Sequence, residues 1–174
     1  GGLGALITTW IWYGKPSLAQ TLNGSLAGLV SITAGCGNMT AGGAVLAGLI
    51  GGIIVVFAIE FIEKKLKIDD AIGAASVHGV AGAWGTLVIG LWGVDGDTAI
   101  GLFNGGGASQ LGVQAIGVLA YAAWAIGLSF IVLVILKKTM GLRVSKEVEI
   151  EGLDISEHGS IAYPGKRQRD FEDK

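Results

Sequence analysis

Residues 68–93, IDDAIGAASVHGVAGAWGTLVIGLWG, place one ionisable ring, His78, inside a long stretch of uncharged and mostly small residues. Such a stretch is long enough to cross the hydrocarbon core of a bilayer, about 30 Å thick, as a helix. A histidine there either packs against a neighbouring helix through a hydrogen bond or marks a route for a substrate or a proton. Because ionisable side chains are costly in a membrane and rarely face lipid, we expect His78 to line a functional path.

The composition of the whole chain is typical of a membrane protein. Hydrophobic residues make up 51% of the 174 residues and charged residues only 15%, and the charges are bunched along the chain. The apolar stretches lack the polar face that a soluble helix needs, and the 31 glycines indicate closely packed membrane helices. The composition therefore predicts an all-α integral membrane protein whose surroundings are the lipid bilayer. A net charge of -2 gives no indication of nucleic-acid binding.

Apolar stretches recur along residues 1–136, which we predict to be the transmembrane region, and residues 137–174 form a polar tail. Five membrane-spanning helices are expected, at about 3–13, 23–36, 43–62, 71–93 and 111–136. Basic residues follow the first, third and fifth stretches but are missing after the second and fourth. Because cytoplasmic loops carry the Lys and Arg residues, the tail should be cytoplasmic. The chain starts at Gly1 without a signal sequence, so we expect a piece of a longer protein.

The spacing along the chain predicts how deep His78 lies in the membrane. Asp70 marks the predicted inner end of the fourth span, and eight residues at about 1.5 Å each put His78 about 12 Å deep, near the midplane of the bilayer. Asp69 and Asp70 are predicted to cap the start of this helix. A neutral imidazole can donate one hydrogen bond and accept another, which suits a small polar solute.

The residues around His78 argue against metal binding and against catalysis. The other histidine, His158, lies in the tail, and no Cys or carboxylate lies at ligand spacing within the span, so neither a metal nor a cofactor is expected. Ser76 precedes His78 by two positions and so points to a different side of a helix, which leaves no nucleophile and base pair. We therefore predict no catalytic residue and no enzyme activity. A soluble enzyme is further disfavoured by the alternating Lys pattern.

Two patterns predict packing rather than function. The pairs Gly24 with Gly28 and Gly48 with Gly52 have the small-xxx-small spacing of close helix contacts. Trp84 and Trp124 are expected to pack in the core.

Three segments resemble the ammonium transporter family, which comprises the Amt, methylammonium permease and Rhesus proteins. DDAIGAASVHGVAGAWGTLVIGLWG (69–93) is similar to the histidine-bearing span of that family. GKPSLAQTLNGSLAGLVSITAGCG (14–37) resembles the junction between its seventh and eighth spans. GLRVSKEVEIEGLDISEHGSIAY (141–163) resembles its C-terminal tail, in the form found in the Amt branch. The matches are long, follow the family order and cover nearly the whole chain.

The resemblance implies an ammonium-transporter-like helical bundle of eleven spans, of which this chain would hold the seventh to the eleventh. Such proteins form homotrimers in the cell membrane, with one narrow pore for ammonium or ammonia in each subunit. His78 would match the second of two pore histidines, while its partner, the gating phenylalanines and the outer ammonium site would lie on spans outside this chain. Two alternatives remain open: an ammonium sensor of the same fold, and a channel for another small gas, as suggested for Rhesus relatives.

The tail has two interpretations. Gly141 is well placed to end the last helix, and the following segment alternates charged residues with Val, Ile and Leu. By composition this segment is a solvated tail, whereas the resemblance implies that it docks on a neighbouring subunit and couples the pores. Ser156 falls where some relatives carry a phosphorylatable threonine. A P-II signal protein is the regulatory partner that the resemblance implies at the cytoplasmic face.

Overall fold

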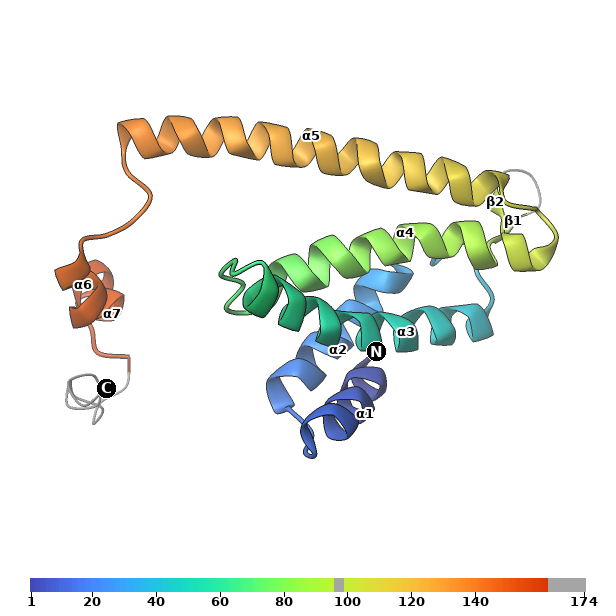
Figure 1. Cartoon of the computed structure of the whole chain (residues 1–174), viewed down its shortest axis with the longest axis horizontal. Helices are drawn as coiled ribbons and strands as arrows, with labels where there is room; N and C mark the ends of the chain where they lie inside the picture. The colour runs from blue at the N-terminus through green and yellow to red at the C-terminus, as the bar shows by residue number, and fades with distance from the viewer. Residues whose placement is uncertain (96–98, 163–174) are drawn as a thin grey trace. The chain divides into compact units, whose positions relative to one another are not determined.

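A computed structural model describes residues 1–95 and 99–162, and within them it is helical apart from one two-residue antiparallel strand pair (Figure 1). The predicted all-α fold is therefore confirmed. The chain divides into two compact units, Gly1–Ala123 and Trp124–Lys174.

The first unit is built from α-helices of 12 to 20 residues, shorter helical turns and the loops that join them. In chain order these elements are α1 (Gly2–Tyr13), α2 (Leu18–Thr33), α3 (Ala41–Glu60), the π-helical turns η1 (Phe61–Lys65) and η2 (Ala75–Val80), α4 (Ala81–Trp92), the paired strands β1 (Val94–Asp95) and β2 (Ala99–Ile100), and the 3-10 turn η3 (Leu102–Asn104). The boundary between the two units falls within α5 (Ser109–Thr139). The second unit continues with α6 (Lys146–Glu151) and α7 (Leu153–His158).

Small residues let the helices of the first unit approach one another closely. A Cβ atom on Gly28 of α2 would lie 3.6 Å from the carbonyl oxygen of Gly48 of α3, and one on Gly85 of α4 would lie 2.7 Å from the carbonyl oxygen of Ser31 of α2. The predicted packing role of Gly28 and Gly48 is therefore confirmed. One apolar cluster joins α2, α3, η2 and α4, and its members are Ala27, Val55, Ile59, Val77 and Ala81.

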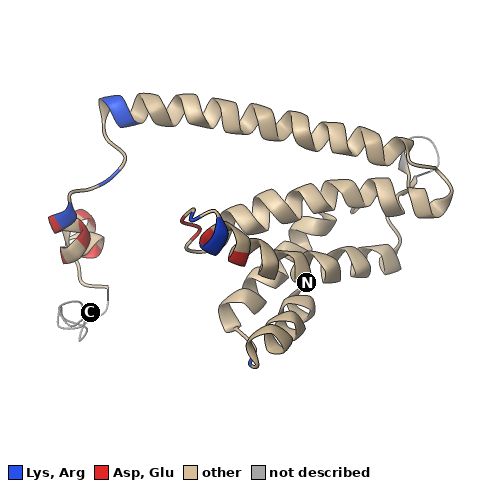
Figure 2. Ribbon diagram, viewed as in Figure 1, with Lys and Arg blue, Asp and Glu red and all other residues tan. Residues whose placement is uncertain are grey.

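Loops of the first unit lie at two opposite ends of its helices. At one end, which we call the lysine end, the Tyr13 hydroxyl at the end of α1 donates a 2.6 Å hydrogen bond to Glu60 at the end of α3. Lys64 forms an ion pair with the same carboxylate at 2.6 Å, and the basic residues of the first unit lie in η1 and in the loops at this end (Figure 2). At the other end the amide of Val94 donates to the Asn38 carbonyl at 2.8 Å. The loops that carry basic residues and the loops that lack them therefore lie at opposite ends of the first unit.

Three helical segments of the described chain are long and apolar enough to cross a membrane: Ala41–Lys65, Ala75–Trp92 and Ser109–Thr139. α1 has 12 residues and α2 has 16, which is short of the roughly 20 residues that a span normally needs. The expectation of five membrane spans therefore stays a prediction.

The fourth predicted span begins later than its apolar sequence suggested. Residues 71–73 form a turn in which the Gly73 amide donates to the Asp70 carbonyl at 2.7 Å, and Gly73 adopts a φ of 74°, which favours glycine. The regular π-helical turn starts at Ala75. The depth of His78 cannot be counted along eight helical residues from Asp70, so the premise of the 12 Å figure was wrong.

The last long helix ends near the position that the sequence predicts. α5 continues to Thr139, and Gly141 follows with a φ of 82°, its amide bonded to the Leu136 carbonyl at 3.0 Å. The prediction that Gly141 ends this helix is confirmed. Trp124 is 69% exposed, so the predicted core packing is not made within this chain.

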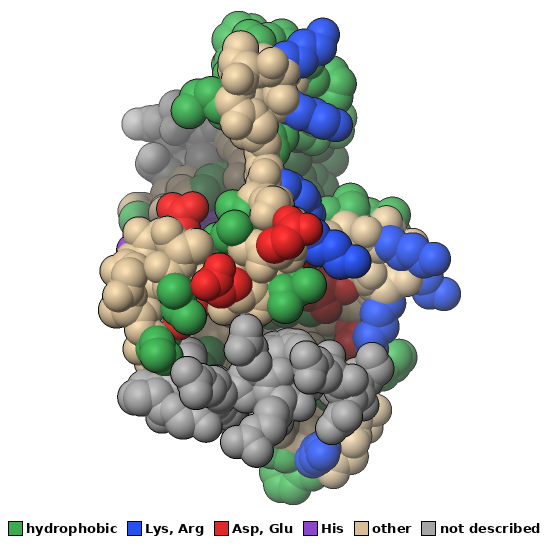
Figure 3. Space-filling model, turned by 90° about the vertical axis from the view of Figure 1, so that its left-hand side faces the viewer, with side chains coloured by type: hydrophobic (Ala, Val, Ile, Leu, Met, Phe, Trp, Pro, Cys, Tyr) green, Lys and Arg blue, Asp and Glu red, His purple; other side chains and the backbone are tan. Residues whose placement is uncertain are grey.

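The second unit combines the end of α5 with two one-and-a-half-turn helices. The Ser145 hydroxyl caps α6 by accepting from the Val148 amide at 3.4 Å, and Gly152 separates α6 from α7. Within this unit a groove of about 540 Å³ is lined by Leu133, Leu142, Arg143, Val144, Glu149 and Leu153. The face of the molecule in Figure 3 carries acidic and basic side chains beside hydrophobic ones.

Candidate functional site

His78 lies in η2, the π-helical turn that precedes α4. The two residues before it, Ser76 and Val77, are buried, whereas the imidazole is exposed in this chain. The turn therefore has one side packed into the first unit and one open side that carries the only histidine of the membrane-length segment Ala75–Trp92. An exposed ring on an apolar helical segment can meet a small solute through one donor and one acceptor.

The turn that carries His78 is wider than an α-helical turn. Its closing hydrogen bond runs from the amide of Ala81 to the carbonyl of Ser76, five residues back. Isolated π turns within helices occur often at functional sites. No pattern in the sequence indicated this geometry, because small residues on all sides of the segment leave no periodicity to read.

Asp70 holds the start of this turn. Its carboxylate accepts the amides of Ala75 at 2.9 Å and Ser76 at 3.1 Å, and also the Ser76 hydroxyl at 2.9 Å. These are amides at a helix start, which have no partner within the helix. The predicted capping role is confirmed for Asp70, which is 6% exposed, while Asp69 is exposed to solvent.

Two opposing effects set the pKa of Asp70. Burial of the carboxyl group raises the pKa, but the hydrogen bonds donated by the Ala75 and Ser76 amides and by the Ser76 hydroxyl outweigh burial and lower it. The net pKa lies below the ordinary value for an aspartate, so the side chain is a carboxylate at neutral pH. An ionised acceptor makes the stronger kind of hydrogen bond.

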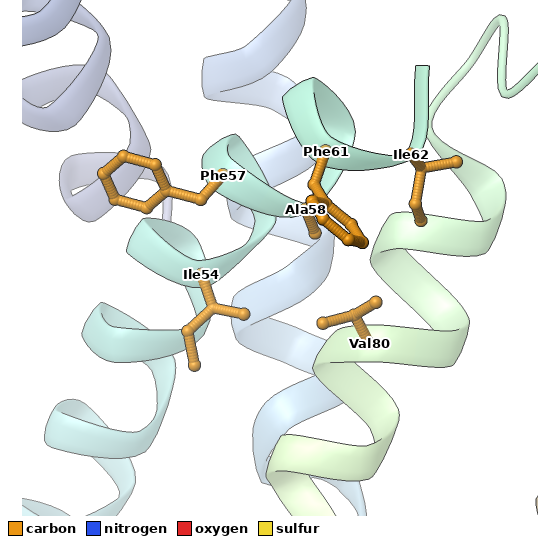
Figure 4. A pocket seen from close by; sticks show the side chains of 6 residues that line it. All are labelled: Ile54, Phe57, Ala58, Phe61, Ile62 and Val80. Atoms are coloured by element: carbon orange, nitrogen blue, oxygen red, sulfur yellow. The ribbon is translucent and has the colours of Figure 1, made fainter. Parts of the chain in front are cut away.

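An apolar groove of about 480 Å³ lies beside the same turn. Figure 4 shows Val80 of η2 facing side chains from the end of α3 and from η1. The side chains that line the groove are all apolar: Ile54, Phe57, Ala58, Phe61, Ile62 and Val80. The lining therefore offers few polar partners to water.

A second polar group lies at the lysine end and was not predicted. Gln20 donates to the Tyr13 hydroxyl at 3.3 Å, and the Tyr13 hydroxyl in turn donates to Glu60. Lys64 completes the network through its ion pair with Glu60. The network joins α1, α2 and α3 across more than 40 residues of sequence (Tyr13 and Glu60 are 47 positions apart), so no local motif could have predicted it.

The remaining predicted site residue lies elsewhere. Ser156 is exposed on α7, where its hydroxyl donates to the Gly152 carbonyl at 3.4 Å. This places it in the second unit, whereas His78 belongs to the first. Within residues 1–95 and 99–162, His, Cys, Asp and Glu form no group of three or more suited to a metal ion.

Curated relatives of this chain are named as ammonium transporters. The ammonium transporter Amt2 of Archaeoglobus fulgidus is 39% identical over 172 residues, which covers 94% of this chain and 36% of that protein. The ammonium transporter Amt1 of Haloferax mediterranei is 42% identical over 164 residues, covering 94% of this chain and 30% of that protein. The chain thus spans about a third of the length of these relatives.

Solved structures show the same fold. The crystal structure of Candida albicans Mep2 matches with a TM-score of 0.75 and 32% sequence identity, over 84% of this chain and 34% of that one. The Ammonium Transporter Family matches residues 1–163, which is most of the chain. The resemblance seen in residues 14–37, 69–93 and 141–163 is therefore confirmed, and this chain belongs to the Ammonium Transporter Family.

Proposed function

We propose that this chain forms the second half of a pore that carries ammonium or ammonia across the cell membrane, with His78 on the pore wall. The observation that carries the proposal is the exposed His78 on a membrane-length apolar segment of a chain from the Ammonium Transporter Family. The names of the curated relatives support ammonium as the substrate.

The chemistry of the segment suits selective passage. A bare potassium ion would lose its water in an apolar path without recovering equivalent contacts, which costs several kcal/mol at least. Ammonium can lose a proton and cross the dry region as ammonia. The imidazole of His78 offers such a neutral amine one hydrogen-bond donor or acceptor, so the solute is not stranded there. A second histidine, which the family resemblance implies, would come from outside this chain.

Topology and assembly follow the same proposal. The lysine end of the first unit would face the cytoplasm, because positively charged loops remain on that side. The tail from residue 137 onward would then be cytoplasmic, and the complete protein would be a homotrimer with a P-II signal protein as a regulatory partner. Ser156 is accessible to a kinase on α7, and a phosphate there would be repelled by the neighbouring Asp154 and Glu157.

The test is ammonium-driven change of internal pH in liposomes that hold the full-length protein, compared with empty liposomes. A fast and saturable change in the protein liposomes alone supports transport. Equal changes in both preparations, with ammonium still bound by the protein in calorimetry, would replace transport by a sensor function. Competition of a candidate small gas with ammonium would indicate a broader gas channel.

A further inference from the structure

We propose that Asp70 and Ser76 form a buried clasp that fixes the rotation of η2 and thereby the direction of the His78 side chain. The two are positioning residues: they act on the solute only through His78. The inference rests on the proposed pore role of His78, but the clasp itself is a feature of the described contacts. Neither residue belongs to the exposed side of the turn, since Asp70 is 6% exposed and Ser76 is 0% exposed.

The clasp engages both oxygens of one carboxylate. Oδ1 of Asp70 accepts the Ala75 amide, and Oδ2 accepts both the amide and the hydroxyl of Ser76. A simple helix cap satisfies backbone amides, and two of these bonds do so. The hydroxyl bond is an additional contact that only a Ser or Thr at this position can make, and its acceptor is charged, which makes it one of the stronger hydrogen bonds.

Ser76 is the residue at which the clasp meets the π turn. Its side chain and amide are bound to Asp70, while its carbonyl accepts the amide of Ala81 across the widened turn. The next residue, Val77, is buried in the apolar cluster with Val55 and Ile59. The clasp therefore holds the backbone two residues before His78, and the hydrogen bond that closes the π turn comes from an amide three residues after it.

A helix that starts with a π turn has a nearby alternative, the ordinary α-helical turn. A slip of one residue between the two registers would rotate the side chains by roughly 100° about the axis. His78 would then leave the open side of η2, and small residues would replace it, because Gly79 and Ala75 adjoin that side. The bonds from Asp70 to Ala75 and Ser76 select one register, since a slip would carry both donors away from the carboxylate.

The experiment reads side-chain direction without relying on transport. The full-length protein is prepared with the substitution His78→Cys as a reporter and with the other cysteines, Cys36 included, changed to Ser. The rate at which a small water-soluble methanethiosulfonate reagent modifies the reporter is measured in three backgrounds. These are the intact clasp, Ser76→Ala, and Ser31→Ala as a matched control.

Ser31 is a suitable control because it is also 0% exposed, and its hydroxyl bonds only to the Ala27 carbonyl of its own helix at 2.6 Å. We expect Ser76→Ala to change the modification rate on the order of tenfold, the population shift that loss of one hydrogen bond to a charged group produces. Ser31→Ala should leave the rate unchanged. Asp70→Asn is a second test and should also change the modification rate. If the Asp70→Asn variant does not fold, the Ser76→Ala variant alone tests the clasp.

Equal modification rates in the intact clasp and the Ser76→Ala background would overturn the clasp. The same holds if the reporter reacts too slowly to measure in both backgrounds. The clasp would also be overturned if Ser31→Ala changed the modification rate as much as Ser76→Ala does. That result would show a general response to the loss of a buried hydroxyl. Ammonium flux is measured separately in protein that keeps His78. Absent flux would refute the proposed pore while the modification rates still decide the clasp, and normal flux with equal rates would refute the clasp alone.

Discussion

Helices α3 and α5 are both apolar enough to cross a membrane, yet they pack in opposite ways. α3 buries nine of its 20 residues within the first unit: Gly43, Ala47, Gly48, Gly51, Gly52, Val55, Val56, Ala58 and Ile59. α5 is longer, with 31 residues, and the whole of it is described, but none of its residues is buried. Overall hydropathy does not explain this difference.

The size of the side chains explains it better. Most of the buried residues of α3 are Gly or Ala, which let another backbone come close. The glycines of α5, such as Gly117 and Gly127, have nothing within 4 Å of a Cβ atom, and large apolar side chains such as Leu119 and Phe130 are exposed. In the proposed membrane protein, a surface of this kind faces lipid or other protein segments. Hydropathy thus indicates which helices can cross, and small residues indicate which of them pack within this chain.

The largest expected effect comes from adding a side chain inside the bundle. Gly85→Val would place a Cβ atom 2.7 Å from the Ser31 carbonyl oxygen and 2.8 Å from its Cα atom, so the backbone of α2 must move. We expect a loss of about 3 kcal/mol in the free energy of unfolding, the upper range for overpacking. Gly127→Val on α5 should change it by less than about 0.5 kcal/mol. Denaturant unfolding of the detergent-solubilised protein measures both, and equal losses would break the contrast between the bundle and α5.

The next effect comes from the cap on η2. Asp70→Asn removes a buried carboxylate that accepts three hydrogen bonds, and we expect a loss of about 2 kcal/mol at neutral pH. Because the pKa of Asp70 is lowered in the folded protein, this stabilisation is present above the ordinary aspartate pKa of about 4 and is lost as the pH falls through the lower folded value.

The difference in unfolding free energy between the parent and Asp70→Asn should therefore be constant at neutral pH and shrink below about pH 4. Thermal unfolding across this pH range measures it. Asp69→Asn is the matched control, because Asp69 is adjacent and exposed. A difference that grows toward acid would show that the carboxylate does not stabilise the fold as described.

A smaller effect is expected at the lysine end. Tyr13→Phe removes one hydroxyl that donates to Glu60, and we expect a loss of about 1 kcal/mol. Tyr121→Phe on α5 removes a hydroxyl from a residue that is 79% exposed and should have no measurable effect. Unfolding midpoints of the two variants give the comparison, and an inert Tyr13→Phe would mean that the network does not tie α1 to α3.

The smallest effect is expected for the ion pair in that network. The Lys64 side chain is 66% exposed, so its pair with Glu60 is weakened by solvent. Lys64→Met should therefore have the smallest cost of the series. Lys138→Met, at the end of α5, provides a control for the loss of one basic charge. A cost for Lys64→Met as large as that of Tyr13→Phe would contradict this ranking.

Much of the fold was predictable from the sequence because apolar length and loop charge are local signals. Helix α3 with η1 covers the predicted span 43–62, and α5 covers 111–136. The cap at Asp70 and the end at Gly141 follow from the chemistry of single residues. Whether all five stretches cross a membrane stays a prediction, as do the pore role of His78 and the modification of Ser156.

Other features depend on contacts that sequence spacing does not encode. Ser76 lies on a different side of the turn from His78, as the spacing predicts, but its hydrogen bond to Asp70 depends on the turn at residues 71–73, which spacing does not reveal. The Tyr13–Glu60 bond joins distant helices. Trp124 was expected to pack in the core, but α5 buries none of its residues against other parts of the described chain.

The central claim is that His78 borders the path of the solute. The most direct measurement compares ammonium-driven internal pH change in liposomes holding the full-length protein, its His78→Leu variant and its His158→Leu variant, at equal protein incorporation. His158 is the matched control, because it is the other histidine of this chain and is exposed at the end of α7. The account predicts that His78→Leu abolishes or alters the flux while His158→Leu equals the parent. Parent-like flux in the His78→Leu variant would contradict it.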